Sequence, residues 1–203
     1  MIVVIDYGLG NLASVYNALT FLGANPKISY SPKDIEKAEK IVLPGVGAFG
    51  DAMKGLEKRG LAEAIKKSLA AGKTYLGICL GLQALFEKSE EGEAGGLGVF
   101  RGRVKRFREK DGIKVPQIGW NSVRLQVTSD KLQVARDIED NSYFYFDHSY
   151  YVKPEDKSIV AATTDYGITF TSMVWRKNIY AVQFHPERSQ GLGLKLLENF
   201  VKC

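Results

Sequence analysis

The sequence predicts an α/β protein with a doubly wound, mostly parallel sheet and an antiparallel extension. Two observations favour this fold class. Short apolar strands alternate with helical segments over the first 86 residues, and the second half consists mainly of strands joined by turns. A third observation is that the glycine-rich turns follow strands, where parallel sheets bind their ligands. With 203 residues and 45% hydrophobic content, we expect one domain over residues 1–203.

The first half begins with the apolar run 2–5, the pattern of a strand buried on both faces of a parallel sheet. Asn11 stands where a helix N-cap is expected. Gly23 and Gly72 follow helical patterns and are expected to end them. We predict strands at 2–5, 26–30, 40–43 and 74–78, and helices at 12–22, 31–36, 51–58, 61–71 and from 80 onward.

The second half begins with the acidic, glycine-rich segment 87–98, which we predict to be a loop. Lys177 and Asn178 are expected to form a hairpin turn. An amphipathic helix at 191–202 should then close the sheet. The strands predicted here are 99–107, 115–126, 143–152, 159–164, 169–175 and 179–184.

Composition limits the function. The two cysteines and two histidines form neither a disulfide framework nor a zinc site. No apolar run reaches the length of a membrane span, and a soluble, cytoplasmic protein is expected. The net charge is +5, and the basic run 101–110 is best interpreted as a solvated strand, rather than a nucleic-acid site. A docking surface for an acidic partner is a third interpretation.

Cys79 is the first candidate catalytic residue. Gly77 and Gly81 flank it with the spacing of a nucleophile elbow, a sharp turn between a strand and a helix. The helix that follows would direct its positive end at the sulfur and favour the reactive thiolate. The alternative is a small buried cysteine in a glycine-rich turn.

Two further segments supply what a cysteine nucleophile needs. The loop 44–50 holds three glycines after a predicted strand and is a candidate oxyanion hole. His185 and Glu187 follow the last strand and would serve as base and as the acceptor that orients it. His148, next to Asp147, is a weaker candidate, because neighbouring strand residues face opposite ways.

Together these three motifs resemble the class I glutamine amidotransferases, or triad glutaminases, over nearly the whole chain. The resemblance implies that Cys79 attacks the side-chain amide of glutamine, with His185 and Glu187 completing the triad. It further implies that the backbone of Leu80 and of the loop meets the oxyanion, and that three side chains hold the amino-acid end of glutamine. The implied oxyanion and substrate residues are Gly45, Val46, Gly47, Leu80, Gln83, Ser149 and Tyr150.

Within this family, segments 6–11, 44–50, 116–121, 148–150 and 185–189 are similar to separate glutaminase subunits of histidine biosynthesis. This resemblance implies a heterodimer in which ammonia passes to a (β/α)8-barrel synthase subunit. It also implies that no metal and no organic cofactor is needed. It places the partner face at Asn11, Trp120, Tyr145 and Arg188. The sequence departs from the family at Asp147, where an apolar residue is expected, and at Arg188, where lysine is common.

Three alternatives compete with this interpretation. A glutaminase serving another synthase, such as pyridoxal phosphate synthase, should lack the segment at 6–11. A non-catalytic binding subunit of the same fold should have a broken triad, whereas all three residues are present here. A cysteine hydrolase or peptidase on a similar sheet would require neither Gln83 nor a partner.

Overall fold

The computed structural model describes residues 1–92, 94–109, 113–128 and 131–203. The first half contains β1 (Ile2–Ile5), α1 (Leu12–Phe21), β2 (Pro26–Ser29), α2 (Pro32–Lys37), β3 (Lys40–Leu43), α3 (Phe49–Lys58), α4 (Leu61–Ala70), β4 (Thr74–Ile78) and α5 (Leu80–Gln83). The second half contains β5 (Phe86–Ser89), β6 (Phe100–Arg106), β7 (Gln117–Leu125), η1 (Gln133–Ala135), β8 (Ser142–His148), β9 (Tyr150–Pro154), η2 (Lys157–Ile159), β10 (Val160–Asp165), β11 (Thr169–Arg176), β12 (Ile179–Val182), η3 (Pro186–Arg188) and α6 (Gln190–Lys202).

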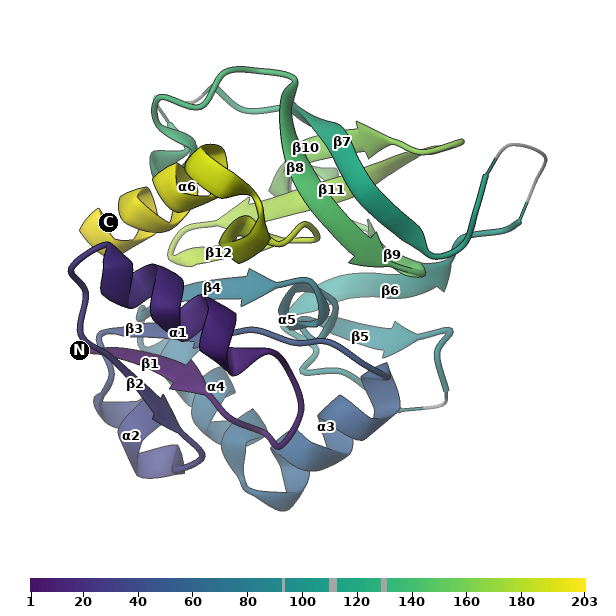
Figure 1. The fold of residues 1–203 in the computed structure, drawn as a ribbon. Helices are drawn as coiled ribbons and strands as arrows, with labels where there is room; N and C mark the ends of the chain where they lie inside the picture. Colours follow the sequence, from purple (N-terminus) through teal and green to yellow (C-terminus); the bar gives the residue numbers. More distant parts are fainter. Residues whose placement is uncertain (93, 110–112, 129–130) are drawn as a thin grey trace.

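The first half forms the parallel part of the sheet, with helices on both faces (Figure 1). Strands β2, β1, β3, β4 and β12 lie side by side in that order and all run parallel. Alternate residues of β1 enter different cores: Val4 packs in the cluster with α1 and α6, and Val3 in the cluster with α2, α3 and α4. The predicted doubly wound sheet is therefore confirmed.

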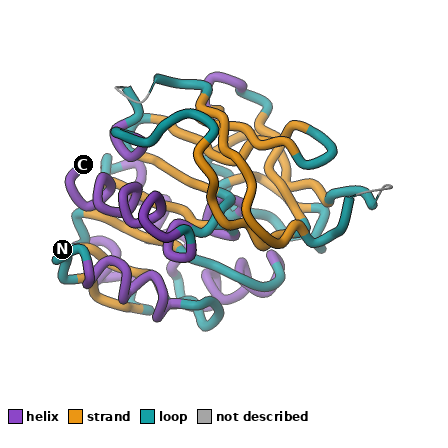
Figure 2. Tube along the Cα trace, turned by 45° about the horizontal axis from the view of Figure 1, so that its top comes forward, coloured by secondary structure: helices purple, strands orange, loops and turns teal. Residues whose placement is uncertain are grey.

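Strand β12 joins the two parts of the sheet. It pairs parallel with β4 on one side and antiparallel with β11 on the other. The main path continues through β10, β7 and β8, while β5, β6 and β9 lie off it. Figure 2 shows the strands beyond β12 rising past the helices as the predicted extension, in which all pairs are antiparallel except β5–β6. The hairpin turn between β11 and β12 falls at Lys177 and Asn178, as predicted.

Three sequence-based predictions about local structure were wrong. Strand β5 occupies part of the segment predicted as a loop at 87–98, because it pairs with β6. The predicted strand 143–152 is two strands separated by Ser149, since β8 pairs with β7 but β9 pairs with β6 and β11. The last strand ends at Val182, so His185 and Glu187 lie on the turn around η3 rather than on the strand.

The basic run coincides with β6. Arg101 and Arg103 are exposed, whereas Gly102 and Val104 between and after them are buried. This alternation is typical of a strand with one solvated face. The last residue of the run, Lys110, lies outside the described residues.

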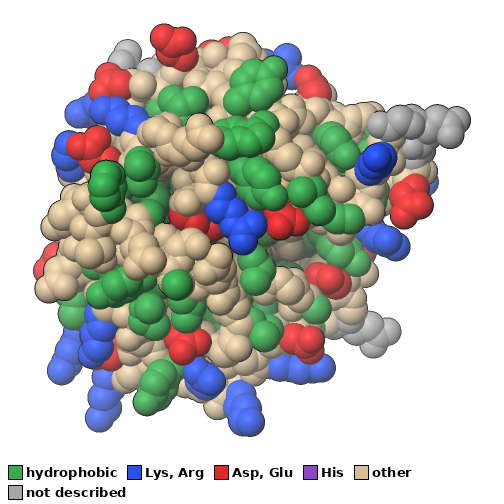
Figure 3. Space-filling view, in the orientation of Figure 1, with side chains coloured by type: hydrophobic (Ala, Val, Ile, Leu, Met, Phe, Trp, Pro, Cys, Tyr) green, Lys and Arg blue, Asp and Glu red, His purple; other side chains and the backbone are tan. Residues whose placement is uncertain are grey.

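Other basic side chains lie away from this run. On the face seen in Figure 3, they gather along the lower edge, over α2 and α3.

None of the described helices combines the length and the hydropathy that a membrane span requires.

Candidate active site

Cys79 lies in the sharp turn between β4 and α5. Its φ of 52° and ψ of −102° are unusual for a residue other than glycine, so this backbone is strained. The turn requires its glycines. A Cβ on Gly77 would lie 2.5 Å from the carbonyl oxygen of Gly81, and a Cβ on Gly81 would overlap the carbonyl oxygen of Leu43. The predicted elbow geometry is therefore present at Cys79.

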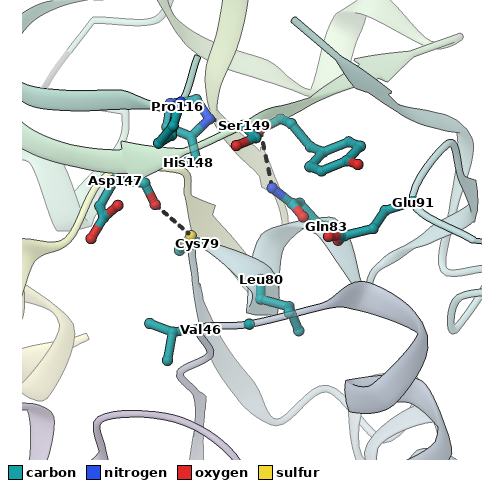
Figure 4. A pocket seen from close by; sticks show the side chains of 11 residues that line it. Val46, Cys79, Leu80, Gln83, Glu91, Pro116, Asp147, His148 and Ser149 are labelled. Atoms are coloured by element: carbon teal, nitrogen blue, oxygen red, sulfur yellow. Dashed lines mark hydrogen bonds between the residues drawn. The ribbon is translucent and has the colours of Figure 1, made fainter. Parts of the chain in front are cut away.

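Cys79 opens into a cavity of about 350 Å³, a size suited to a small metabolite. Figure 4 shows Val46 and Leu80 on one side of the sulfur, Asp147 and His148 on the other, and Gln83 and Glu91 further in. The cavity is lined by Val46, Gly47, Cys79, Leu80, Gln83, Glu91, Pro116, Asp147, His148, Ser149 and Tyr150. Of the predicted oxyanion and substrate residues, only Gly45 is missing from this lining.

The loop after β3 approaches the nucleophile closely. Gly45 packs against Leu80 and the Tyr7 hydroxyl, so that a Cβ there would lie 2.8 Å from Leu80 Cβ. Gly47 has a φ of 97°, a conformation that glycine adopts without strain. Leu80 is the first residue of α5, and its N–H has no partner within the helix. The loop and the elbow thus bring backbone groups to the same side of Cys79.

His185 and Glu187 form a buried pair. His185 Nδ1 lies 2.8 Å from Glu187 Oε1, and the two side chains are 2% and 3% exposed. A carboxylate at Nδ1 holds the ring so that Nε2 faces away from it. Burial alone would lower the pKa of His185. The nearby Cys79 thiolate and Glu187 outweigh it and raise the pKa well above its usual value. His185 is therefore expected to hold its proton beside Cys79.

Cys79 and His185 come together because their strands are neighbours. Ile78 and Val182 are register partners in the parallel pair β4–β12, and the Cys79 N–H donates to the Val182 carbonyl at 2.8 Å. Both residues follow the carboxyl ends of these strands, where parallel sheets place their ligands. The backbone topology alone thus brings the two residues to one edge of the sheet.

The alternative base, His148, is placed differently. Its Nδ1 is 2.6 Å from the Tyr150 carbonyl, to which the ring donates. Burial lowers its pKa to about 4, against the effect of this hydrogen bond and with a smaller contribution from His185. Asp147 pairs with Arg188 at 3.5 Å instead of orienting His148. His148 is therefore a neutral residue that fixes the backbone of the cavity wall.

The residues predicted for a partner face lie around β7, β8 and η3. The rings of Trp120 and Tyr145 meet edge to face, with centroids 6.2 Å apart, and the Arg188 guanidinium lies over Tyr145. Asn11 caps α1 by accepting from the Ser14 N–H, and α1 contacts η3. Trp120 is 46% exposed, and Ile118 and Tyr143 on the same two strands are 62% and 58% exposed.

Two residues at the site were not predicted. Glu91 lines the cavity, and its Oε2 accepts from the Phe49 N–H at 2.8 Å. Its only signal in the sequence is weak, an acidic residue in a glycine-rich segment. Gln183 is fully buried, and its Nε2 lies 3.4 Å from Cys79 Sγ. Its position two residues before His185 was the available signal.

Comparisons with known proteins agree with this geometry. A family model described as "Glutamine amidotransferase class-I" matches residues 3–203. The chain therefore belongs to the class I glutamine amidotransferases, which are enzymes that hydrolyse glutamine and transfer its ammonia.

Relatives of high sequence identity place the chain in one family within this class. The imidazole glycerol phosphate synthase subunit HisH of Nostoc punctiforme is 49% identical over 99% of this chain and 95% of its own length. The subunit HisH of Trichodesmium erythraeum is 50% identical over 98% of this chain and 93% of its own length. Within the class, the chain belongs to the family of these HisH subunits.

Solved structures at lower identity share the fold. A structure of PurLQS from Thermotoga maritima matches with a TM-score of 0.75 at 18% identity, over 99% of this chain and 97% of that one. The glutaminase domain of CTPS from Trypanosoma brucei, with bound acivicin, matches with a TM-score of 0.67 at 16% identity, over 99% and 93% of the two chains.

Proposed function

We propose that this chain is the glutaminase subunit of an imidazole glycerol phosphate synthase, with Cys79, His185 and Glu187 as its catalytic triad. The observation that carries the proposal is the strained elbow at Cys79 beside the buried pair of His185 and Glu187. A cysteine held next to a histidine that a carboxylate orients is the arrangement that covalent amide hydrolysis uses.

The reaction follows from these positions. The Cys79 thiolate attacks the side-chain carbonyl carbon of glutamine and forms a tetrahedral intermediate. The Leu80 N–H and the backbone of the loop 45–47 stabilise its oxyanion. The His185 imidazolium gives its proton to the leaving nitrogen, the C–N bond breaks, and ammonia departs. A water activated by neutral His185 then hydrolyses the thioester to glutamate.

The cavity suits the amino-acid end of glutamine. Gln83, Ser149 and Tyr150 line the wall beyond Cys79, and we assign them to the carboxylate and amino groups of the substrate. Glu91 adds a carboxylate beside Gln83, which would attract the ammonium group (Figure 4). The reacting amide of the same molecule would then reach Cys79.

The proposed partner is a (β/α)8-barrel synthase subunit, which would form a heterodimer with this chain in the cytoplasm and receive the ammonia. The exposed aromatic and apolar side chains of β7 and β8 support a docking face there, because single-chain surfaces seldom expose such a group. Asn11 and Arg188 border this face in the proposal.

The test is glutamate release from glutamine, measured for the purified chain alone, with the synthase subunit, and with the nucleotide ligand of that subunit. We expect low activity alone and a sharp rise in the ternary mixture. Cys79→Ala should abolish glutamine hydrolysis, while its complex should still make product from an ammonium salt. Cys203→Ala, which changes the exposed second cysteine, is the matched control.

The outcomes separate the parts of the proposal. Hydrolysis that persists in Cys79→Ala would show that Cys79 is not the nucleophile. High activity that ignores the synthase subunit would keep the glutaminase and contradict the partner. A chain inactive under all three conditions would favour a binding subunit of the same fold.

A further inference from the structure

Gln183 sits between the nucleophile and the substrate wall without touching solvent. Its side chain is fully buried, and its backbone N–H donates to the Ser172 carbonyl at 2.8 Å. Its Nε2 is 3.4 Å from Cys79 Sγ, and its Oε1 is 3.2 Å from Gln83 Nε2. A buried amide is costly unless both of its ends are satisfied, and here both ends meet residues of the proposed site.

The chemistry of the partners fixes which way the amide points. A thiolate only accepts hydrogen bonds, so the amino end of Gln183 must face the sulfur. Its carbonyl end must then accept from Gln83. The Gln83 Nε2 also donates to the Tyr150 carbonyl at 3.2 Å, so both of its N–H groups have partners. The Gln83 Oε1 is therefore the atom left to accept from a ligand.

The short length of α5 makes such a donor necessary. The sequence predicted a helix from residue 80 onward whose dipole would favour the thiolate, but α5 has only four residues, and a dipole grows with the number of aligned peptides. Apart from the charged His185, the other polar contact of Sγ among the described residues is the Asp147 carbonyl at 4.0 Å, which cannot donate to a thiolate. The Gln183 amide is thus the neutral donor nearest to the sulfur.

We propose that Gln183 is a positioning residue that links the two ends of the glutamine site. The Gln183 Nε2–H donates a hydrogen bond to the Cys79 thiolate at the elbow. The Gln183 Oε1 accepts from Gln83 and so orients the Gln83 side chain, which leaves the Gln83 Oε1 free to accept from the substrate amino group. This inference rests on the proposed function, because it takes Cys79 as the nucleophile and Gln83 as a substrate residue. It adds a residue outside the triad whose loss affects both the chemistry and the binding of glutamine.

The thiolate can be tested without turnover, because the chain carries its own reference thiol. Iodoacetamide alkylation of Cys79 and Cys203 can be followed by peptide mass spectrometry from pH 5 to 10. The titratable side chains that face Cys79 or line its cavity are His185, Tyr7, Asp147, His148, Tyr150 and Glu91. None of these six side chains is changed in the variants.

Gln183→Met removes both ends of the amide at similar length. A hydrogen bond to a charged acceptor is worth about tenfold or more in an equilibrium. We therefore expect the rise in the Cys79 alkylation profile to move upward by about one pH unit, while the Cys203 profile is unchanged. Gln117→Met is the matched control: Gln117 is a buried glutamine on β7 that does not contact Cys79, and its Cys79 profile should match the wild type.

Gln183→Glu separates the two roles. In its ionised form the glutamate keeps oxygens that accept from Gln83 and has no hydrogen to donate to Cys79. In the complex with the synthase subunit, we expect kcat for glutamine to fall in both variants. KM should rise several-fold in Gln183→Met and stay within about twofold of the wild type in Gln183→Glu. A merely structural role would lower thermal stability without this difference in KM.

The result that would overturn the inference is a wild-type Cys79 alkylation profile in Gln183→Glu and Gln183→Met, in a chain whose wild type hydrolyses glutamine. Failure of the proposed function is a different result, namely no glutamine hydrolysis by the wild-type complex. Gln183→Glu has nearly the same size as the wild type and differs by its ionisable carboxyl, so its alkylation profile carries the test if Gln183→Met does not fold.

Discussion

The parallel strands β1 to β4 and the antiparallel strands β7 to β11 both reach the same cavity, but they prepare it differently. The parallel part positions Cys79 through backbone shape, with glycines packed against carbonyl groups at the elbow. The antiparallel part buries polar side chains along its strands, and four of their atoms have no hydrogen-bond partner in the described structure: Gln117 Oε1, His148 Nε2, Thr164 Oγ1 and Ser172 Oγ. The other three such atoms, Tyr7 OH, His185 Nε2 and Glu187 Oε2, belong to turns that follow the parallel strands β1 and β12 rather than to the strands themselves.

These two strategies carry different costs. A strained backbone costs about 1–3 kcal/mol and is offset by tight packing around it. A buried polar atom without a partner costs about as much and is offset only when water or a ligand reaches it. We infer that the parallel part is a rigid support for the nucleophile, whereas the antiparallel part holds groups that respond to pH and to bound molecules.

The largest effect should come from breaking the rigid support. Gly81→Ala places a methyl group on the Leu43 carbonyl oxygen, so the elbow or β3 must move. We expect unfolding free energy to fall by about 4 kcal/mol, as for severe overpacking. Urea denaturation measures this directly.

Gly191→Ala is the control for replacing a glycine by alanine where no close packing opposes the added methyl group. Gly191 lies in the first turn of α6, and a Cβ there meets no atom within 4 Å. This variant should be as stable as the wild type or more stable by up to about 1 kcal/mol. Equal losses in the two variants would contradict the role of close packing at Gly81.

A smaller effect should come from the buried histidine of the antiparallel part. Burial lowers the pKa of His148 to about 4 from 6.5, with a raising effect from Tyr150 and a lowering one from His185. Between these values the unfolded chain binds a proton that the folded protein does not. Stability is therefore fully present above pH 6.5 and is lost as pH falls toward 4, by up to ~3 kcal/mol.

His148→Asn keeps a donor for the Tyr150 carbonyl and removes the titrating ring. The difference in unfolding free energy between this variant and the wild type should change by most of that amount between about pH 7 and about pH 4.5. Parallel stability curves over this range would mean that His148 is not buried in its neutral form.

The smallest effect concerns the exposed ion pair beside the site. Asp147 and Arg188 are 39% and 36% exposed at 3.5 Å, so solvent and salt screen their attraction. Asp147→Asn should change stability by less than about 1 kcal/mol, and the change should shrink further in high salt. A larger, salt-independent loss would show that this pair belongs to the buried polar network.

The sequence predicted the parallel part well because its signals are local. A continuous apolar run at 2–5 and glycines around Cys79 reflect burial and turn geometry that each segment requires on its own. The segment at 86–89 carried no comparable signal, because it becomes a strand only by pairing with β6. The break at Ser149 likewise depends on strand partners far away in sequence.

The site was predictable to a similar extent. Cys79, His185 and Glu187 stand out because few residue types perform this chemistry. Gln183 and Glu91 did not, because an amide or a carboxylate gains its role from its neighbours in space. Gln183 acquires its partners from the elbow and α5, about 100 residues away in sequence.

The central claim concerns Cys79, which follows β4, and His185, which follows the neighbouring strand β12. The negative charge of Cys79 keeps His185 protonated. The direct measurement is an NMR titration of the two imidazoles in the wild type and in Cys79→Ala. His148 serves as the internal reference, because its pKa is lowered by burial.

We predict that His185 in the wild type stays protonated well above its usual pKa, since the charge of Cys79 raises it. In Cys79→Ala the pKa of His185 should fall by roughly one to three pH units. The reason is that burial lowers this pKa, and only Glu187 would then remain to raise it. The same His185 titration in both chains would contradict the claim that the two residues form an ion pair.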